Sequence, residues 1–285
     1  MHTNIYTDIK EPLFRQAVEA VDAGNISLLK DLLAEHPDLI NQSTWFPGGG
    51  YFECPCLIYF VAGNPTRNST LPENILGIMK VLIENVKQHA TNKQEQLDYT
   101  LGLIESGRIP RECGKQIAMM DLLIDAGAKP GNGSAALAHG NIDAAKHLIK
   151  RGGEYTLVAA ACFNETDKIK ELAANSNKEE LLTALTAAAF YGNAEIIALL
   201  LKTGVNPGGY PQSGFHTHAT PLHQAVHSGS LECVKLLIGS GADSNATDKV
   251  YKGTALGWAI YMQAEAKNET EKNSFKEIEE YLKTL

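Results

Sequence analysis

The stretch ATPLHQAVHSGSLECVKLLIGSGADSNATD, from Ala219 to Asp248, contains the signals for two helices joined by a tight turn. Thr220 can accept a hydrogen bond as an N-cap residue, and Pro221 suits the first helical position because its missing N–H would have no partner there. Gly229 permits a tight reversal after the first, short helix. The apolar residues that follow recur with a helical period up to Gly241, which can close a helix in the left-handed conformation. The stretch therefore predicts a helix, a turn, a second helix and a loop.

Three segments of the chain superpose on one another without gaps. They are HGNIDAAKHLIKRGG from His139, YGNAEIIALLLKTGV from Tyr191 and SGSLECVKLLIGSGA from Ser228. In weaker form the unit recurs along the whole chain, and its first helix is expected to end at Gly24, Gly63, Gly107, Gly140, Asn164, Gly192 and Gly229. The average step between these positions is about 34 residues. Because a single unit of this kind cannot bury its apolar face alone, the pattern predicts a stack of repeats.

The clearest copy resembles the ankyrin repeat family, through its TPLH helix start at Thr220 and its GADSNA exit loop from Gly241. The resemblance implies an all-α ankyrin-repeat solenoid of about eight helix-turn-helix units, several of them irregular or with insertions. It also implies that His223 ties neighbouring loops together by hydrogen bonds. An array of tetratricopeptide type is the alternative, and it fits less well because its two helices are of similar length and lack such an exit loop.

We expect a single domain over residues 1–285, with no separate non-repeat domain. Its parts would be an N-terminal capping pair at 12–41, regular repeats at 131–260 and a C-terminal capping helix at 274–285. Three stretches of loop-like composition are expected to interrupt the repeats, at 64–74, 108–115 and 263–274.

Composition and charge exclude several classes of protein. The 25 Lys and Arg against 33 Asp and Glu give a net charge of −8, which argues against general nucleic-acid binding because phosphate-backbone binders need a positive face. No apolar run approaches the roughly 18 residues of a membrane span, and the first residues lack the apolar core of a signal peptide. The five cysteines include no CxxC pair, so neither a disulfide framework nor a thiolate zinc site is favoured. We therefore expect a cytoplasmic protein without nucleic-acid or membrane partners.

A group of histidines raises the question of a metal site. His216, His218, His223 and His227 lie close together in the sequence, and the last two are one helical turn apart, as in some zinc sites. A metal-dependent protein using residues 216–227 is therefore an alternative. We prefer the interpretation without a metal, because His223 belongs to the repeat motif and no carboxylate or cysteine is adjacent in sequence. The chain also lacks the common catalytic motifs, so we expect no cofactor and no enzyme activity.

The resemblance indicates where a partner would bind. In ankyrin arrays the variable residues of the short helices and the loops between repeats form a concave surface. Aromatic residues, which often anchor protein interfaces, are concentrated at these positions. The candidate partner-binding residues are Phe163, Phe190, Tyr191, Tyr210, Phe215, His227, Trp258 and Tyr261. The alternative is that some of these aromatic side chains pack internally. A second candidate surface is the loop from Ser43 to Phe52.

The function that follows is a protein–protein interaction module without catalysis, presenting its concave surface to an unidentified protein partner. A narrower alternative is an inhibitor or immunity-type regulator that masks a partner enzyme or toxin. We expect a monomer rather than an oligomer.

Overall fold

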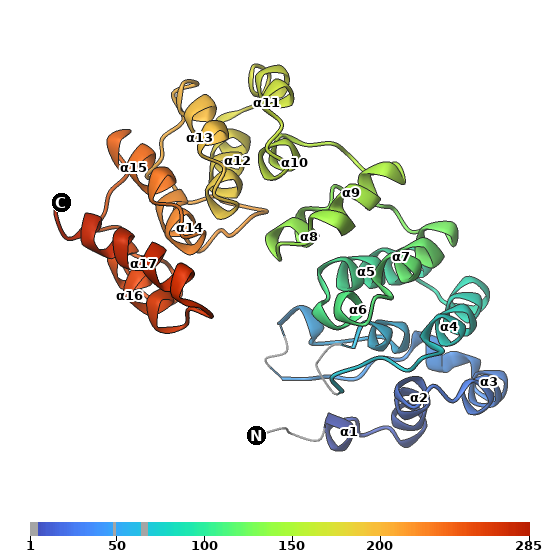
Figure 1. The fold of residues 1–285 in the computed structure, drawn as a ribbon. Helices are drawn as coiled ribbons and strands as arrows, with labels where there is room; N and C mark the ends of the chain where they lie inside the picture. Colours follow the sequence, from blue (N-terminus) through green and yellow to red (C-terminus); the bar gives the residue numbers. More distant parts are fainter. Residues whose placement is uncertain (1–4, 48–49, 64–67) are drawn as a thin grey trace. The chain divides into compact units, whose positions relative to one another are not determined.

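The computed structural model describes residues 5–47, 50–63 and 68–285 (Figure 1). Within these ranges the regular elements are helices, and β-pairing is limited to two isolated bridges, Ser43 with Cys56 and Thr247 with Thr254. The prediction of an all-α fold is therefore confirmed. By its contacts the chain divides into two compact units. The N-terminal unit comprises Met1–Gly131 and Lys146–Gly153, and the C-terminal unit comprises Asn132–Ala145 and Glu154–Leu285.

The N-terminal unit begins with a pair of antiparallel helices and continues with 3-10 turns and further helices. Its elements are α1 (Ile5–Asp8), α2 (Pro12–Asp22), α3 (Ile26–Glu35), η1 (Pro37–Asn41), η2 (Gly50–Phe52), η3 (Leu57–Ala62), α4 (Ile75–His89), α5 (Lys93–Ser106), α6 (Arg108–Glu112) and α7 (Gln116–Asp125). Helix α2 starts with a proline, and α3 is capped by Asn25, whose side chain accepts from the Leu28 N–H at 3.1 Å. The apolar faces of both helices are buried, including Phe14, Val18 and Leu29.

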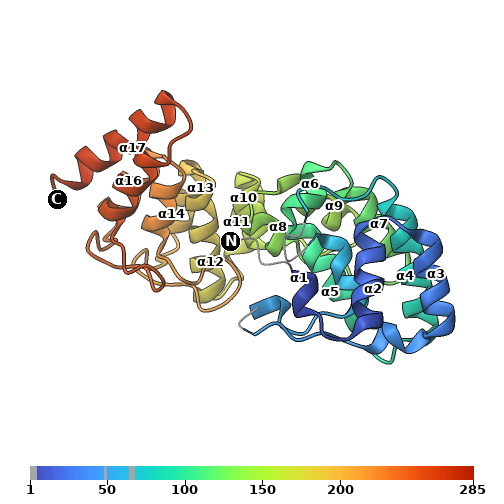
Figure 2. The same ribbon diagram turned by 90° about the horizontal axis from the view of Figure 1, so that it is seen from below.

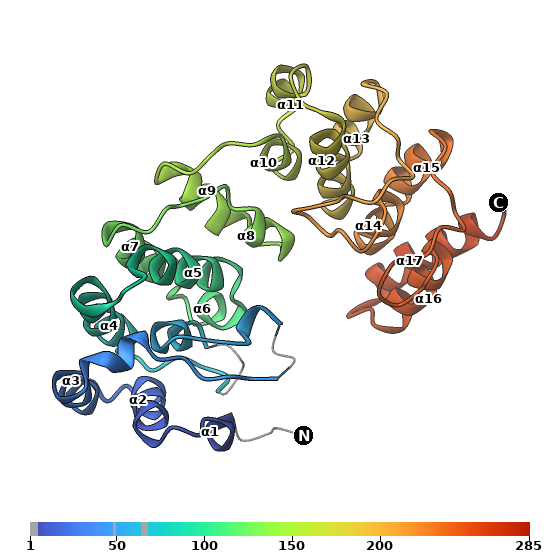
Figure 3. The ribbon, with the colours of Figure 1, turned by 180° about the vertical axis from the view of Figure 1, so that it is seen from behind.

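The C-terminal unit is a regular two-layer stack. Its elements are α8 (Ser134–Ala138), α10 (Leu157–Cys162), α11 (Thr166–Ala173), α12 (Lys178–Phe190), α13 (Ala194–Leu201), α14 (Pro221–His227), α15 (Leu231–Gly239), α16 (Ala255–Ala264) and α17 (Glu269–Leu282), and the division between the units falls inside α9 (Ile142–Lys150). Helices α8, α10, α12, α14 and α16 pack in order as an inner layer, and α11, α13, α15 and α17 pack in order as an outer layer (Figures 1 and 3). Helices α16 and α17 lie side by side at the C-terminal end (Figure 2).

Small side chains let the inner helices approach one another closely. Ala160, Ala188, Ala225 and Ala259 are fully buried between neighbouring helices, in one continuous apolar core with Leu200 and other residues of the outer layer. Each helical pair covers the apolar face of the next pair, so the core is built by stacking.

The turn between the two helices of a pair repeats the same backbone geometry. Its left-handed residue has φ between 59° and 70° at Gly24, Gly63, Gly114, Gly140, Asn164, Gly192 and Gly229. Asn164 takes this conformation although it is not glycine, because asparagine tolerates it better than most residues. Helix α5 ends at Gly107 as expected, but Gly107 has φ −69° and precedes α6, so the left-handed turn into α7 is made by Gly114.

Two expected insertions turn out to be largely helical. Residues 108–112 form α6, because Pro110 lies within the first turn, where its missing N–H costs no hydrogen bond. The polar stretch 263–274 was expected to be a loop, but α16 extends to Ala264 and α17 starts at Glu269. Asn268 caps α17 by accepting from the Glu271 N–H at 2.9 Å, so the polar residues form an exposed helical face. Of the third expected insertion, residues 64–67 lie outside the described ranges.

His223 connects two neighbouring repeats, as the resemblance implied. Its ring is fully buried, and Nε2 lies 3.0 Å from the carbonyl oxygen of Gly253 in the following loop. Since a carbonyl only accepts, Nε2 donates, and Nδ1 accepts from the Thr220 hydroxyl at 2.8 Å. Thr220 therefore uses its hydroxyl to fix the tautomer of His223.

The left-handed turn gives the first testable prediction. Replacing Gly192 with Ala should lower the free energy of unfolding by about 1–2 kcal/mol, because an L-residue needs about that much to adopt the left-handed conformation. The cost is conformational, since an added Cβ would meet nothing closer than 3.5 Å.

Gly239→Ala is the matched control, because Gly239 lies in α15 and an added Cβ would meet no atom within 4 Å. This change should raise the free energy of unfolding by about 0.5–1 kcal/mol. Urea denaturation followed by circular dichroism measures both, and equal effects of the two variants would contradict the assignment of the turn.

Candidate functional site

The predicted partner-binding residues all lie in the C-terminal unit, within or just after its inner helices or in the loops between repeats. We call the first group the inner face; it consists of Phe163, Phe190, Tyr191, His227, Trp258 and Tyr261. We call the loops 206–218 and 243–253 the long finger and the short finger. Tyr210 and Phe215 belong to the long finger.

The ring contacts of this region centre on Phe190, at the end of α12. His227 stacks on it with 5.1 Å between ring centroids and 11° between planes. His216 lies 4.7 Å away and Tyr191 5.2 Å away, measured between the same centroids. Phe190 is itself half-buried. It therefore holds the rings around it in place and also leaves part of its own ring accessible to a partner.

Phe215 lies inside the protein. It is 1% exposed and packs edge-on against Phe190 and His216. A side chain in this position cannot contact a partner directly, so we remove Phe215 from the candidate surface and assign it to the support of the long finger. An aromatic residue is buried here because the extended finger folds back over α12 and gains its own small core.

Tyr191 and Phe163 are half-buried. The Tyr191 hydroxyl donates to the Leu137 carbonyl oxygen at 2.8 Å, and burial, with Cys162 nearby, raises the pKa of this phenol. The Phe163 ring contacts that of Tyr155, with centroids 6.2 Å apart. Tyr191 and Phe163 therefore each make a structural contact and leave only part of the side chain accessible to a partner. His227 and Tyr261 are exposed, Tyr261 at 63%.

Trp258 is held by a residue that sequence analysis missed. Its indole N–H donates to Oδ2 of Asp248 at 3.0 Å, and Gly253 N donates to the same oxygen at 2.8 Å. Oδ1 accepts from the backbone N–H groups of Val250, at 2.9 Å, and Tyr251, at 2.6 Å. Burial alone raises the pKa of the Asp248 carboxyl, but these four hydrogen bonds outweigh burial and lower its pKa to about 2.

Asp248 thus folds the short finger and positions the indole at once. It is fully buried, which is rare for a carboxylate unless every oxygen is satisfied. The sequence offered one signal, an aspartate just after the exit loop and five residues before a glycine, which is typical of a side chain that caps its own turn.

The two fingers are joined to each other. The Tyr210 hydroxyl donates to the Thr247 carbonyl oxygen at 2.7 Å, and the backbone N–H of Lys249 donates to the His218 carbonyl oxygen at 2.7 Å. In the middle of the long finger, the backbone N–H groups of Gln212 and Ser213 donate to the Glu179 carboxylate. Tyr210 is therefore half-buried at the junction between fingers.

The histidines are engaged in ring contacts and hydrogen bonds. Both ring nitrogens of His223 have partners, and His218 stacks with Trp258. Burial, followed by the neighbouring His218, His227 and His139, lowers the pKa of His216 to about 4, and partial burial lowers the pKa of His227. Across residues 5–47, 50–63 and 68–285, no three His, Cys, Asp or Glu side chains are grouped so that they could hold a metal ion.

The second candidate surface, the loop from Ser43 to Phe52, belongs to the N-terminal unit. Trp45 and Tyr51 are exposed there, whereas Phe52 is buried and stacks with Phe46 at 6.3 Å between centroids. Gly48 and Gly49 lie outside the described residues.

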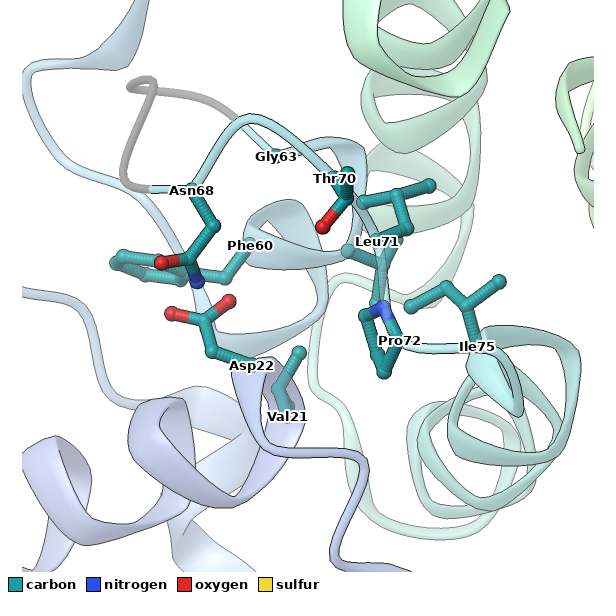
Figure 4. Close-up of a pocket in the computed structure, with 10 residues that line it drawn as sticks. Val21, Asp22, Phe60, Gly63, Asn68, Thr70, Leu71, Pro72 and Ile75 are labelled. Carbon is teal, nitrogen blue, oxygen red and sulfur yellow. The ribbon is translucent and has the colours of Figure 1, made fainter. Parts of the chain in front are cut away.

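A cavity in the N-terminal unit is too small for a ligand (Figure 4). It has room for about one water molecule and is lined by Val21, Asp22, Phe60, Val61, Gly63, Asn68, Thr70, Leu71, Pro72 and Ile75. The side chains of Asp22 and Asn68 turn toward each other in it (Figure 4). Among the described helices, none is both long and apolar enough to cross a membrane.

The Asp248 contacts predict the effect of its replacement. Asp248→Asn should lower the free energy of unfolding by about 2–4 kcal/mol, because it places an amide N–H₂ against backbone donors that then lack an acceptor. The pKa of Asp248 is lowered on folding, so its contribution is present above about pH 4 and is lost as the pH falls toward about 2. The difference between wild type and variant should shrink over that window in urea titrations, and a constant difference would contradict this role.

The lowered pKa of His216 predicts a loss of stability in weak acid. The folded protein keeps this ring neutral down to about pH 4, whereas the unfolded chain protonates it near its ordinary value of 6.5. His216→Asn removes the titration and tolerates the left-handed backbone at this position, where φ is 46°. Between pH 7 and pH 4.5 the variant should lose about 2 kcal/mol less stability than wild type. Equal losses in both proteins would show that His216 is not the titrating group.

Parts of the chain are similar to segments of three characterised proteins. It is 27% identical over 140 residues to transient receptor potential cation channel subfamily A member 1 of Homo sapiens, covering 48% of this chain and 11% of that protein. It is 33% identical over 121 residues to glycerophosphocholine phosphodiesterase gde1 of Schizosaccharomyces pombe, covering 40% and 10%. It is 40% identical over 67 residues to E3 ubiquitin-protein ligase KEG of Arabidopsis thaliana, covering 23% and 4%.

The chain thus spans about a tenth or less of the length of these relatives, so the activities in their names are not transferred to it. The family comparison is more specific. The sequence model of a protein family, described as ankyrin repeats (3 copies), matches residues 133–248 and 210–268. These residues contain α8 to α16 and both fingers. Together with the stacked helical pairs and the His223 contact, this match shows that residues 133–268 of the chain belong to the ankyrin-repeat family.

Proposed function

We propose that this chain is a protein-binding module, without catalysis, that receives its partner on the inner face and the fingers of the C-terminal unit. Ankyrin repeats are protein-interaction modules, and the match to this family supports the general role. The observation that carries the specific site is the exposure of Tyr261 and His227 on neighbouring inner helices, next to fingers that are fixed by buried hydrogen bonds.

The proposed mechanism is the rigid presentation of a preformed surface. Asp248, His223 and Tyr210 each connect one loop to another element, so the fingers need little further ordering when a partner binds. Association then loses less conformational entropy than it would with mobile loops. The narrower alternative, a regulator that masks an enzyme or toxin, uses the same surface and the same mechanism.

The two buried cysteines are poorly suited to covalent catalysis. Cys162 and Cys233 are buried, and burial raises the pKa of both thiols, which keeps them protonated and unreactive at neutral pH. All five cysteines are free. Free thiols are usual in reducing compartments, which supports the proposal of a cytoplasmic module; that the module is a monomer is part of the same proposal.

A double variant tests the proposed surface. Tyr261→Ser combined with His227→Ser removes the two exposed inner-face rings, whereas Tyr191 and Trp258 are avoided because their hydrogen bonds stabilise the fold. Affinity capture from the native host, followed by quantitative mass spectrometry, should show about a tenfold loss of the proteins that wild type captures.

The matched control is Lys170→Ser combined with Glu195→Ser, two exposed residues of the outer helices α11 and α13 whose charges cancel. This control should capture the same proteins as wild type. Unchanged capture by the inner-face variant, with circular dichroism showing all three proteins folded, would contradict the proposed surface.

A further inference from the structure

The tip of the short finger is an exposed apolar and basic surface in an acidic protein. It consists of Lys249, Val250, Tyr251 and Lys252, which we call the finger tip. Val250 is 60% exposed and Tyr251 is 79% exposed, the latter more than any other large hydrophobic side chain described in the chain. Both lysines are exposed as well.

The finger tip has a defined conformation despite its exposure. The Asp248 carboxylate holds the backbone N–H groups of Val250, Tyr251 and Gly253, and Lys252 adopts the left-handed conformation with φ 58°. The Lys252 ammonium donates to the Lys249 carbonyl oxygen at 3.0 Å. These hydrogen bonds fix the backbone of the finger tip, so Val250 and Tyr251 are not needed to pack inside it. Apolar side chains that are held in solvent in this way are typical of a binding surface.

The Lys249 ammonium is positioned by the long finger. Its nitrogen lies 4.8 Å from the centroid of the Tyr210 ring, within the range of a cation–π contact. Because Tyr210 is in turn tied to the Thr247 carbonyl oxygen, the positive charge is directed to one place on the surface. Together the two fingers therefore present a fixed positive charge beside exposed apolar side chains.

Acidic residues are distributed unevenly across the C-terminal unit, with more of them on the outer helices than on the inner face. The outer helices have an excess of acids: Asp167, Glu171, Glu195, Glu232, Glu269, Glu271, Glu277, Glu279 and Glu280, against Lys168, Lys170, Lys235, Lys272 and Lys276. The six residues of the inner face include no carboxylate, and the carboxylate of Asp248 is buried and satisfied by four donors. The exposed acids near the inner face and the short finger include Glu165, in the turn after Phe163, Asp243, at the start of the finger, and Glu265, just after α16.

We infer that the finger tip binds an acidic segment of the partner protein, with carboxylates paired to Lys249 and Lys252 and an apolar side chain between Val250 and Tyr251. This inference rests on the proposed function and specifies the chemistry of the partner. The opposite charges of segment and finger tip would direct the encounter, while the acidic outer helices would repel the same segment. A nucleic acid fits less well, because two lysines neutralise few phosphates in a chain with a net charge of −8.

The test is a selection of random peptides of about 12 residues, displayed on phage, against the immobilised full chain. Selected peptides should have an excess of Asp and Glu around an aromatic or aliphatic residue. Fluorescein-labelled copies of these peptides are then measured by anisotropy. Lys249→Glu combined with Lys252→Glu should weaken their binding by about tenfold or more, and raising the salt concentration should weaken binding to wild type as well.

Lys267→Glu combined with Lys276→Glu is the matched control. Both lysines are exposed outside the fingers, and the change in net charge is the same. Its affinity for the peptides should stay within about twofold of wild type, because the introduced charges lie away from the fingers. Thermal melts establish that both double variants are folded.

The outcomes separate the inference from the proposed function. Suppose that the selected peptides bind the Tyr261→Ser and His227→Ser variant more weakly than wild type. If these peptides carry no excess of Asp and Glu, or if they bind the finger-tip variant as tightly as wild type, the inference is wrong and the proposed function stands. If no peptide is selected, or if binding survives both variants, the proposed function fails as well. Preferential binding of an oligothymidine strand that is lost in the finger-tip variant would overturn the assignment to a protein segment.

Discussion

Most helical pairs of this protein share one backbone constraint, a single residue in the left-handed conformation just after the first helix, whereas the last pair, α16 and α17, turns without one. The reversal brings the second helix back against the first within a few residues, so that the pair has one apolar face toward each neighbour. In the C-terminal unit this geometry recurs at Gly140, Asn164, Gly192 and Gly229. Because the φ values are similar, the two helices of each of these pairs pack against each other in the same way. Stacking of such similar pairs places the inner helices in one layer and the outer helices in another.

The close approach of the inner helices restricts where a binding surface can form. Alanines in their middle turns are buried against the next helix, and most of the candidate residues lie at the helix ends or in the loops, whereas Trp258 and Tyr261 lie within α16. Phe190 is an example: it is the last residue of α12, and its ring contacts one ring from α14 and two from the long finger. The same stacking that builds the core therefore gathers residues distant in sequence at one edge of the layer.

Buried polar groups give this edge its rigidity. His223 and Asp248 have satisfied hydrogen bonds, and each connects a helix to a finger. A buried carboxylate with four donors is costly to disrupt, so the finger tip stays in place although Val250 and Tyr251 make it hydrophobic. The net charge does not reveal this local arrangement: the chain is acidic as a whole, but the finger tip carries Lys249 and Lys252 and no carboxylate.

The sequence by itself determined the helical class, the repeat and the contact of His223, because these follow from local signals such as TPLH at Thr220 and a glycine after each short helix. It located the end of α5 at Gly107 but not the left-handed turn, which Gly114 makes after the additional helix α6. The burial of Phe215, the four donors around Asp248 and the exposure of Tyr251 were decided by tertiary structure alone. The physical reason is that burial and hydrogen bonding of a loop depend on what folds beside it, and those neighbours come from other repeats.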